Sequence, residues 1–124
     1  MRGLAAAVLA AYCTLSFAQD RAEAYLLVQV CFITAFKHYE GKYVFSRLRL
    51  GDSLGLIRER DNVDDANAVR VEWQGRTLGY VSRDANEAIA RQLDFGNRLR
   101  ARITRLSRHR DPNRRVEMEV VLPY

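Results

Sequence analysis

The segment RDNVDDAN at residues 60–67 concentrates polar side chains just before AVRVEW, which alternates like a strand. Its acids and amides are Asp61, Asn62, Asp64, Asp65 and Asn67. Carboxylate oxygens accept hydrogen bonds, and amides both donate and accept them, so the segment is a candidate site for a polar ligand. Asp and Asn also bond their own backbone in turns. Asx turns that lead into the strand are therefore the structural alternative.

A second group of candidate residues is the set of arginines near the C-terminus. On an expected strand, Arg98, Arg100 and Arg102 share one face, and the apolar residues between them share the other, so these arginines should face solvent. The alternative is that cross-strand pairing with Glu117 and Glu119 neutralises part of their charge. The hairpin loop that follows holds a single acid, Asp111, and its four arginines have no such cross-strand partners. They are candidates to bind the phosphates of a nucleic acid or of anionic lipid, and are Arg108, Arg110, Arg114 and Arg115.

Neither metal chemistry nor catalysis finds support in the remaining residues. Cys31 lies in the apolar run LLVQVCFITAF, where a small buried side chain is expected, and His38 and His109 are far apart with no ligand spacing. The chain contains no GxxxxGK[ST] loop, no GxSxG elbow and no HExxH pair. We expect a protein that is not an enzyme and that uses no cofactor or metal.

The first 18 residues have the pattern of a cleaved secretory signal peptide. Arg2 precedes an apolar stretch, and Ser16 and Ala18 occupy the positions that signal peptidase requires to be small. The alternative is a membrane anchor, but the stretch from Gly3 to Ala18 is shorter than the roughly 20 residues of a spanning helix. We expect cleavage after Ala18 and a periplasmic or secreted protein. The remaining segment 19–124 is the size of one domain, and the formal charge of +5 for the whole chain favours a polyanionic partner.

Periodicity predicts a mainly β domain with one main helix. The helix is expected over residues 82–96, with Asp84 and Glu87 at capping-box spacing and Gly96 as its stop. The dipeptide Gln74–Gly75 predicts a tight hairpin, and Trp73 beside it is expected to pack in the core. We expect a small OB- or SH3-like barrel or a strongly curved antiparallel sheet, which begins as a meander. The predicted strands are 25–36, 44–50, 54–59, 68–73, 76–81, 97–106 and 115–123, with turns at 39–43 and 51–53.

Four segments in this order and spacing resemble the HIRAN domain. They are FKHYEG, LGLIRERDNVDDANAVRVEW, LGYVSRDANEAIARQLD and LRARI, and the resemblance extends over about residues 27–122. HIRAN domains are small β-barrels found in certain DNA-remodelling helicases and as free-standing bacterial proteins. In this chain a valine, Val63, replaces the proline of the family's turn, and Asp64 replaces a tyrosine.

The resemblance implies binding of nucleic acid, with capture of a free 3′ end of single-stranded DNA. The acidic turn would recognise the 3′-hydroxyl, because a carboxylate such as Asp65 accepts a hydrogen bond from a hydroxyl and repels a phosphate. Lys37 and Arg83 would hold phosphates. The alternative is an exported interaction module for another anionic partner, such as an envelope polymer, a lipid surface or an acidic protein. The positions that match the family's site are Lys37, His38, Tyr39, Asn62, Asp64, Asp65, Tyr80 and Arg83.

Overall fold

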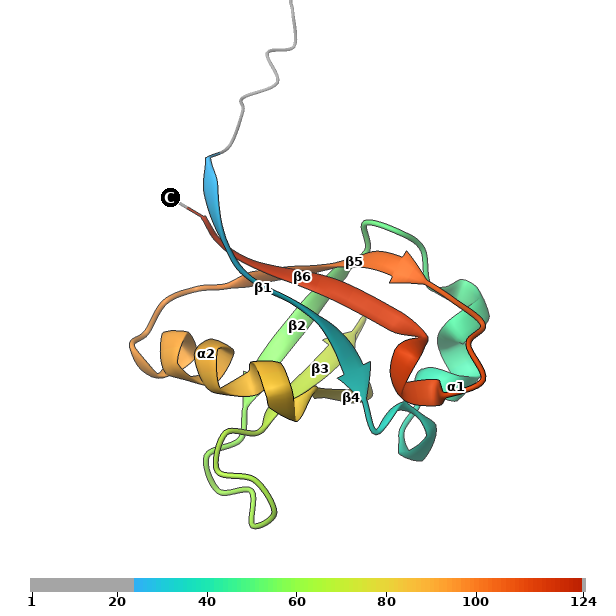
Figure 1. The fold of residues 1–124 in the computed structure, drawn as a ribbon, viewed down its shortest axis with the longest axis horizontal. Helices are drawn as coiled ribbons and strands as arrows, with labels where there is room; N and C mark the ends of the chain where they lie inside the picture. Colours follow the sequence, from blue (N-terminus) through green and yellow to red (C-terminus); the bar gives the residue numbers. More distant parts are fainter. Residues whose placement is uncertain (1–23, 124) are drawn as a thin grey trace, which may run out of the picture.

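The computed structural model describes residues 24–123, which form a closed barrel of six antiparallel strands with one main helix (Figure 1). The expected barrel is confirmed. The strands are β1 (Tyr25–Thr34), β2 (Ser53–Arg58), β3 (Val69–Trp73), β4 (Arg76–Val81), β5 (Arg100–Leu106) and β6 (Val116–Pro123). The helices are α1 (Gly41–Val44) and α2 (Arg83–Asp94), and single 3₁₀ turns are η2 (Phe36–His38), η3 (Phe45–Arg47) and η4 (Pro112–Arg114).

The strand order is β1-β4-β3-β2-β5-β6, which closes on itself. Strands β2, β3 and β4 pair consecutively as the expected meander, and β5 pairs with β6 as the expected final hairpin. Strand β1 departs from a meander because it pairs with β6 over most of its length and with β4 only at Ile33 and Thr34. The first strand and the last therefore close the barrel.

The prediction of a strand at 44–50 is wrong. Residues 41–47 form α1 and η3 instead, and the segment continues as a turn to Gly51. Val44 and Leu48 are both fully buried and lie four residues apart, which places them on one face of a helical turn. Leu50, which a strand would place on the same face, is exposed. The turn predicted over residues 39–43 is likewise largely helical.

The β3–β4 hairpin turns at Gln74 and Gly75 as predicted. Both have positive φ, 50° and 79°, which is the type I′ geometry that matches the twist of paired strands. Within the hairpin, the register of the strand pairing shifts between Val71 and Glu72 on β3. The shift is a β-bulge, and it places Arg70 opposite Tyr80.

Helix α2 lies within the predicted range and packs its apolar face on the barrel. Ala85, Ile89 and Ala90 are buried in the core, and Gly96 ends the helical segment with a φ of 88°. The predicted capping box is wrong, because the N-cap is Ser82 and its side chain makes no capping hydrogen bond. Glu87 instead pairs with Arg91 one turn along the helix.

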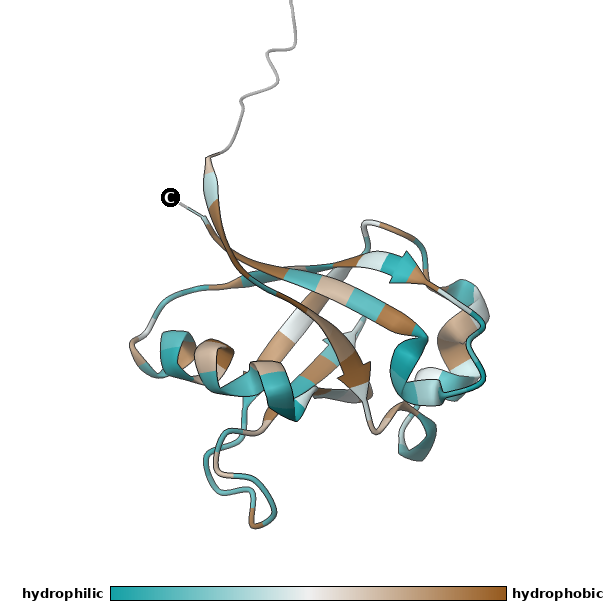
Figure 2. Cartoon of the chain, viewed as in Figure 1, coloured by the Kyte–Doolittle hydropathy of each residue, from teal (hydrophilic) through white to brown (hydrophobic). Residues whose placement is uncertain are grey.

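The core runs through the barrel and includes the residues predicted to be buried. Cys31 is buried, and its burial, together with Asp84 and Glu117, raises the pKa of its thiol to about 12. Trp73 is also buried, as expected, and its indole Nε1 donates a 3.0 Å hydrogen bond to Asp52. Figure 2 shows hydrophobic and hydrophilic residues alternating along β6, whereas β1 is hydrophobic over most of its length. Because its raised pKa keeps the buried Cys31 thiol protonated, the thiol is unsuited to act as a nucleophile.

The proposed signal peptide at 1–18 lies outside the described residues. Within residues 24–123 no helix is both long and apolar enough to span a membrane. The same range contains no cluster of His, Cys, Asp and Glu side chains arranged to hold a metal ion.

Candidate nucleic-acid interface

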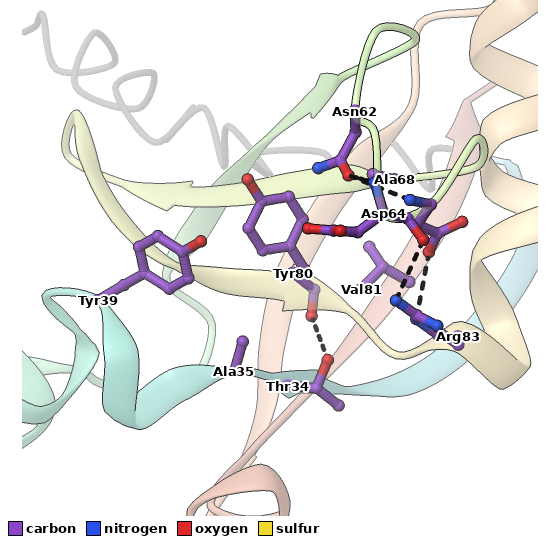
Figure 3. A pocket seen from close by; sticks show the side chains of 10 residues that line it. Thr34, Ala35, Tyr39, Asn62, Asp64, Ala68, Tyr80, Val81 and Arg83 are labelled. Atoms are coloured by element: carbon purple, nitrogen blue, oxygen red, sulfur yellow. Dashed lines mark hydrogen bonds and ion pairs between the residues drawn. The ribbon is translucent and has the colours of Figure 1, made fainter.

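A cavity of about 220 Å³ opens where β1, β4 and the acidic loop 59–68 meet (Figure 3). Six of the eight predicted site residues line it, although they come from four separate parts of the chain. Figure 3 shows Tyr39 and Tyr80 side by side, with Asp64 and Arg83 beyond Tyr80. The six are Tyr39, Asn62, Asp64, Asp65, Tyr80 and Arg83, and the other lining residues are Thr34, Ala35, Ala68 and Val81.

The floor of the cavity depends on a close approach between β1 and β4. Gly79 makes this approach possible, because a Cβ atom there would lie 2.2 Å from the carbonyl oxygen of Thr34. Thr34 in turn donates a 3.3 Å hydrogen bond from its hydroxyl to the Tyr80 carbonyl. Ala35 then adopts a left-handed conformation with φ of 58°, which turns the chain into η2. This turn brings Tyr39 back over Tyr80.

The acidic loop is held by two Asx turns of the kind that the sequence left open. Asn62 Oδ1 accepts hydrogen bonds from the backbone N–H groups of Asp64 and Asp65, at 2.9 and 3.1 Å. Asp65 Oδ1 accepts one from the N–H of Asn67 at 2.9 Å. The backbone alternative is therefore confirmed for Asn62. It holds for Asp65 too, the residue predicted to contact a ligand.

Asp65 is further fixed from helix α2. Asn86 is only 3% exposed, and its Nδ2 donates a 2.7 Å hydrogen bond to Asp65 Oδ2. Arg83 Nε lies 3.6 Å from the same oxygen, and the Arg83 guanidinium also reaches the carbonyl of Asp64. Each carboxylate oxygen offers two lone pairs. Oδ2 faces both Asn86 and Arg83, whereas Oδ1 accepts only from Asn67, so one lone pair of Oδ1 remains. Asp65 is thus a rigid acceptor with capacity left for one ligand donor.

The two tyrosine rings form an aromatic wall. Their centroids are 5.6 Å apart and their planes are tilted by 59°. The Tyr80 hydroxyl donates a 2.8 Å hydrogen bond to Glu59, which also accepts from Asn62 and forms an ion pair with Arg70. Burial and this bond to Glu59 raise the pKa of Tyr80, so its hydroxyl stays protonated as a donor. The hydrogen bond to the Glu59 carboxylate therefore fixes the position of the Tyr80 ring.

Glu59 stays ionised in this arrangement. Partial burial alone would raise the pKa of Glu59, but hydrogen bonds from Tyr80 and Asn62 and the charge of Arg70 outweigh it and lower the pKa below its ordinary value. Glu59 and Asn86 are not among the site residues predicted from the sequence, and neither of them lines the cavity. Both act on residues that do.

Two predicted site residues lie outside the cavity, and a third, Asp64, lines it with an exposed side chain. Lys37 and His38 are exposed on η2 and do not line the cavity. The carboxylate of Asp64 is exposed and makes no hydrogen bond or ion pair within residues 24–123. Asp64 therefore adds negative charge next to Asp65, while Arg83 beside them and Lys37 on η2 supply positive charge.

The predicted arginine groups separate into distinct surroundings. Arg98, Arg100 and Arg102 are exposed as expected, and Arg102 pairs with Glu119 across the hairpin. Glu117 accepts a hydrogen bond from Thr104 instead. Two of the loop arginines, Arg108 and Arg115, share a second cleft with Lys42 and Phe45. Arg114 lies by Asn113 in a depression beside β1. Arg110 is exposed.

Comparison with known proteins agrees with this architecture. A protein from Lactobacillus plantarum of known crystal structure shares 27% sequence identity over 82% of this chain and 97% of its own, with a TM-score of 0.69. The HIRAN domain of human HLTF shares the fold at 16% identity, with 80% and 77% of the two chains covered and a TM-score of 0.56. No curated protein matches the sequence significantly. The HIRAN domain model matches residues 26–124, and the chain therefore belongs to the HIRAN domain family, whose members are nucleic-acid-binding modules without catalysis of their own.

Proposed function

We propose that the protein binds single-stranded DNA and prefers a strand that ends in a free 3′-hydroxyl. The observation that supports this proposal is the cavity itself, which combines two tyrosine rings with a rigidly held carboxylate acceptor. The terminal base stacks on the tyrosine wall, since base–aromatic stacking tolerates any sequence. The protein supplies binding and no bond-breaking step.

Discrimination between strand ends rests on Asp65. A 3′-hydroxyl donates a hydrogen bond to a remaining lone pair of its carboxylate, whereas a 3′-phosphate meets the negative charge of both Asp64 and Asp65. Arg83 is exposed beside this carboxylate and binds the phosphate that precedes the terminal nucleotide. Lys37, which is exposed on η2, adds a second phosphate contact.

The test compares strands that differ only at their 3′ ends. The purified protein should bind the 3′-hydroxyl strand about tenfold or more tightly than the 3′-phosphate strand, because a charge-assisted hydrogen bond contributes about 1.5 to 3 kcal/mol. Asp65→Asn should reduce this ratio. Asp61→Asn is the matched control, because Asp61 is an exposed acid of the same loop that does not line the cavity.

The result that contradicts the proposal is equal binding of both ends by the folded protein. Binding of other polyanions with the same affinity would then support an interaction module for a different anionic partner, held by the loop arginines. Anisotropy titrations at two salt concentrations separate these outcomes, because non-specific binding weakens steeply with salt.

A further inference from the structure

A second cleft, of about 250 Å³, lies between α1 and the β5–β6 loop. It is lined by Lys42, Phe45, Arg108 and Arg115. Three cations therefore surround one hollow, and no carboxylate of residues 24–123 forms an ion pair with any of them. The lining is suited to an anion, and the ring of Phe45 adds an apolar wall.

The side chains of this cleft are held in place by neighbours. The guanidinium carbon of Arg108 lies 5.9 Å from the centroid of the Phe45 ring, and that ring packs edge-on against the buried Phe36. Arg115 donates a 2.8 Å hydrogen bond from Nε to the carbonyl of His109. Its other guanidinium nitrogens remain available, so the two arginines present donors without first having to be ordered.

The cleft is adjacent to the tyrosine cavity along the chain and in space. Tyr39 lines the cavity and Lys42 lines the cleft, so their Cα atoms are at most about 11 Å apart. The loop is also tied to the cavity, since Asn113 Oδ1 accepts a 2.9 Å hydrogen bond from the N–H of Ala35. In Figure 1 the β5–β6 connection runs beside α1, and Figure 2 shows that connection as hydrophilic throughout.

The surface of α1 beside the cleft suits a single strand. Tyr43 is 72% exposed, and the ammonium group of Lys42 lies 5.0 Å from the centroid of its ring. An exposed ring beside a cation matches the alternation of bases and phosphates in a strand. Glu40 is the one acid in the segment 36–49, so the surface keeps a net positive charge.

We infer that the strand bound in the tyrosine cavity continues past α1 and places a backbone phosphate in the cleft of Lys42, Arg108 and Arg115. The inference rests on the proposed function and adds a second contact point for the same ligand. The ligand chemistry is a phosphodiester, which a phospholipid head group shares. Only a strand long enough to reach from the cavity to the cleft gains from the second contact.

The experiment measures how affinity depends on strand length. Lys42→Gln combined with Arg108→Gln removes two exposed cations of the cleft. The matched control is Arg76→Gln combined with Arg98→Gln, which removes two exposed cations that line neither hollow. The ligands are a trinucleotide, titrated by NMR, and a strand of about ten nucleotides, within the usual site size of such folds.

The cleft variant should bind the longer strand about tenfold more weakly than the unmodified protein, with a salt slope smaller by about 0.7, because one fewer phosphate contact releases counterions. Its affinity for the trinucleotide should equal that of the control variant. Equal loss for both lengths, or no loss for the longer strand, would overturn the inference. So would a loss confined to phosphatidylglycerol vesicles, which would assign the cleft to lipid.

This design tests the two proposals independently of each other. Each variant is also titrated with trinucleotides that end in a 3′-hydroxyl or a 3′-phosphate. If the preference between these ends is absent in every variant, the end-capture proposal is wrong. The length-dependent loss still decides whether a strand backbone occupies the cleft.

Discussion

The hydroxyl of Tyr80 donates a 2.8 Å hydrogen bond to Oε1 of Glu59, a carboxylate that lies outside the cavity whose wall Tyr80 forms. The same Oε1 accepts from Asn62, and Oε2 pairs with Arg70. One carboxylate therefore links the aromatic wall to the acidic loop. Changes to Glu59 should alter both walls of the cavity together, although Glu59 itself does not line it.

Glu59→Gln should destabilise the protein by about 1 to 3 kcal/mol at neutral pH, because Arg70 loses one of its two carboxylate partners and Gln accepts hydrogen bonds more weakly. The lowered pKa of Glu59 fixes the pH dependence. The stabilisation is complete above the ordinary carboxyl pKa of about 4.3 and is lost as the pH falls through the lower folded value. Urea unfolding at neutral pH and near pH 3 should show the difference between the two proteins shrinking with acid.

The control for this measurement is Glu87→Gln on the solvent face of α2. Glu87 pairs with Arg91 in the open, so its loss should cost only about 0.2 to 0.5 kcal/mol. If the effect of Glu59→Gln does not change with pH, the carboxylate does not act through its charge.

Asn86→Ala should loosen the acidic loop without a change in the tyrosine wall. The buried Asn86 amide holds Asp65 from α2, and its removal leaves one carboxylate oxygen without that donor. We expect a loss of about 1 to 3 kcal/mol in unfolding free energy. The amides of Asp65 and Asn67, whose hydrogen bonds lie inside the loop, should exchange faster with solvent.

A matched substitution separates loop anchoring from general destabilisation. Asn97→Ala removes a similar amide, which bonds Gln92 at the end of α2. That variant should lose stability while the loop amides keep their exchange rates. Unchanged exchange in Asn86→Ala would mean that the Asx turns hold Asp65 unaided.

How far the sequence predicts this site depends on strand register. Counting from the turn at Gln74 and Gly75 places Arg70 opposite Gly79, with Tyr80 on the other face of the sheet. The β-bulge between Val71 and Glu72 shifts the pairing by one residue and brings Tyr80 opposite Arg70. A bulge of this kind has no clear sequence signature. The network of Glu59, Arg70 and Tyr80 is therefore visible only in the structure.

The error at residues 44–50 has a different physical origin. VFSRLRL satisfies both a period of two and a helical spacing, since Val44 and Leu48 suit either. The outcome depends on the preceding turn, where a Cβ atom on Gly41 would clash with the ring of Phe36 at 2.4 Å. That contact fixes α1 against η2. The local sequence pattern does not reveal this contact. By contrast, the helical periodicity along α2 and the Gln74–Gly75 turn are strong local signals.

The processing prediction addresses residues that the structure does not describe. Protein recovered from its native host should have the intact mass of residues 19–124, because Ser16 and Ala18 fit signal peptidase. Ala18→Leu should block cleavage and leave the full-length chain. Soluble protein of full-length mass from unmodified cells would exclude export through this segment.

Tyr39→Ala tests whether the aromatic wall binds a base. The Tyr39 ring is exposed and lies 5.6 Å from that of Tyr80, so its removal leaves one ring of the pair. Single-strand affinity should fall by about tenfold or more, since stacking contributes about 1 to 3 kcal/mol per base. The ratio between 3′-hydroxyl and 3′-phosphate strands should persist, because Asp65 keeps its hydrogen bonds to Asn67 and Asn86. Phe95→Ala, which removes an exposed ring outside the cavity, should leave both the affinity and the ratio unchanged. If Tyr39→Ala binds as tightly as the unmodified protein, the tyrosine pair is a packing feature of η2 and the base stacks elsewhere.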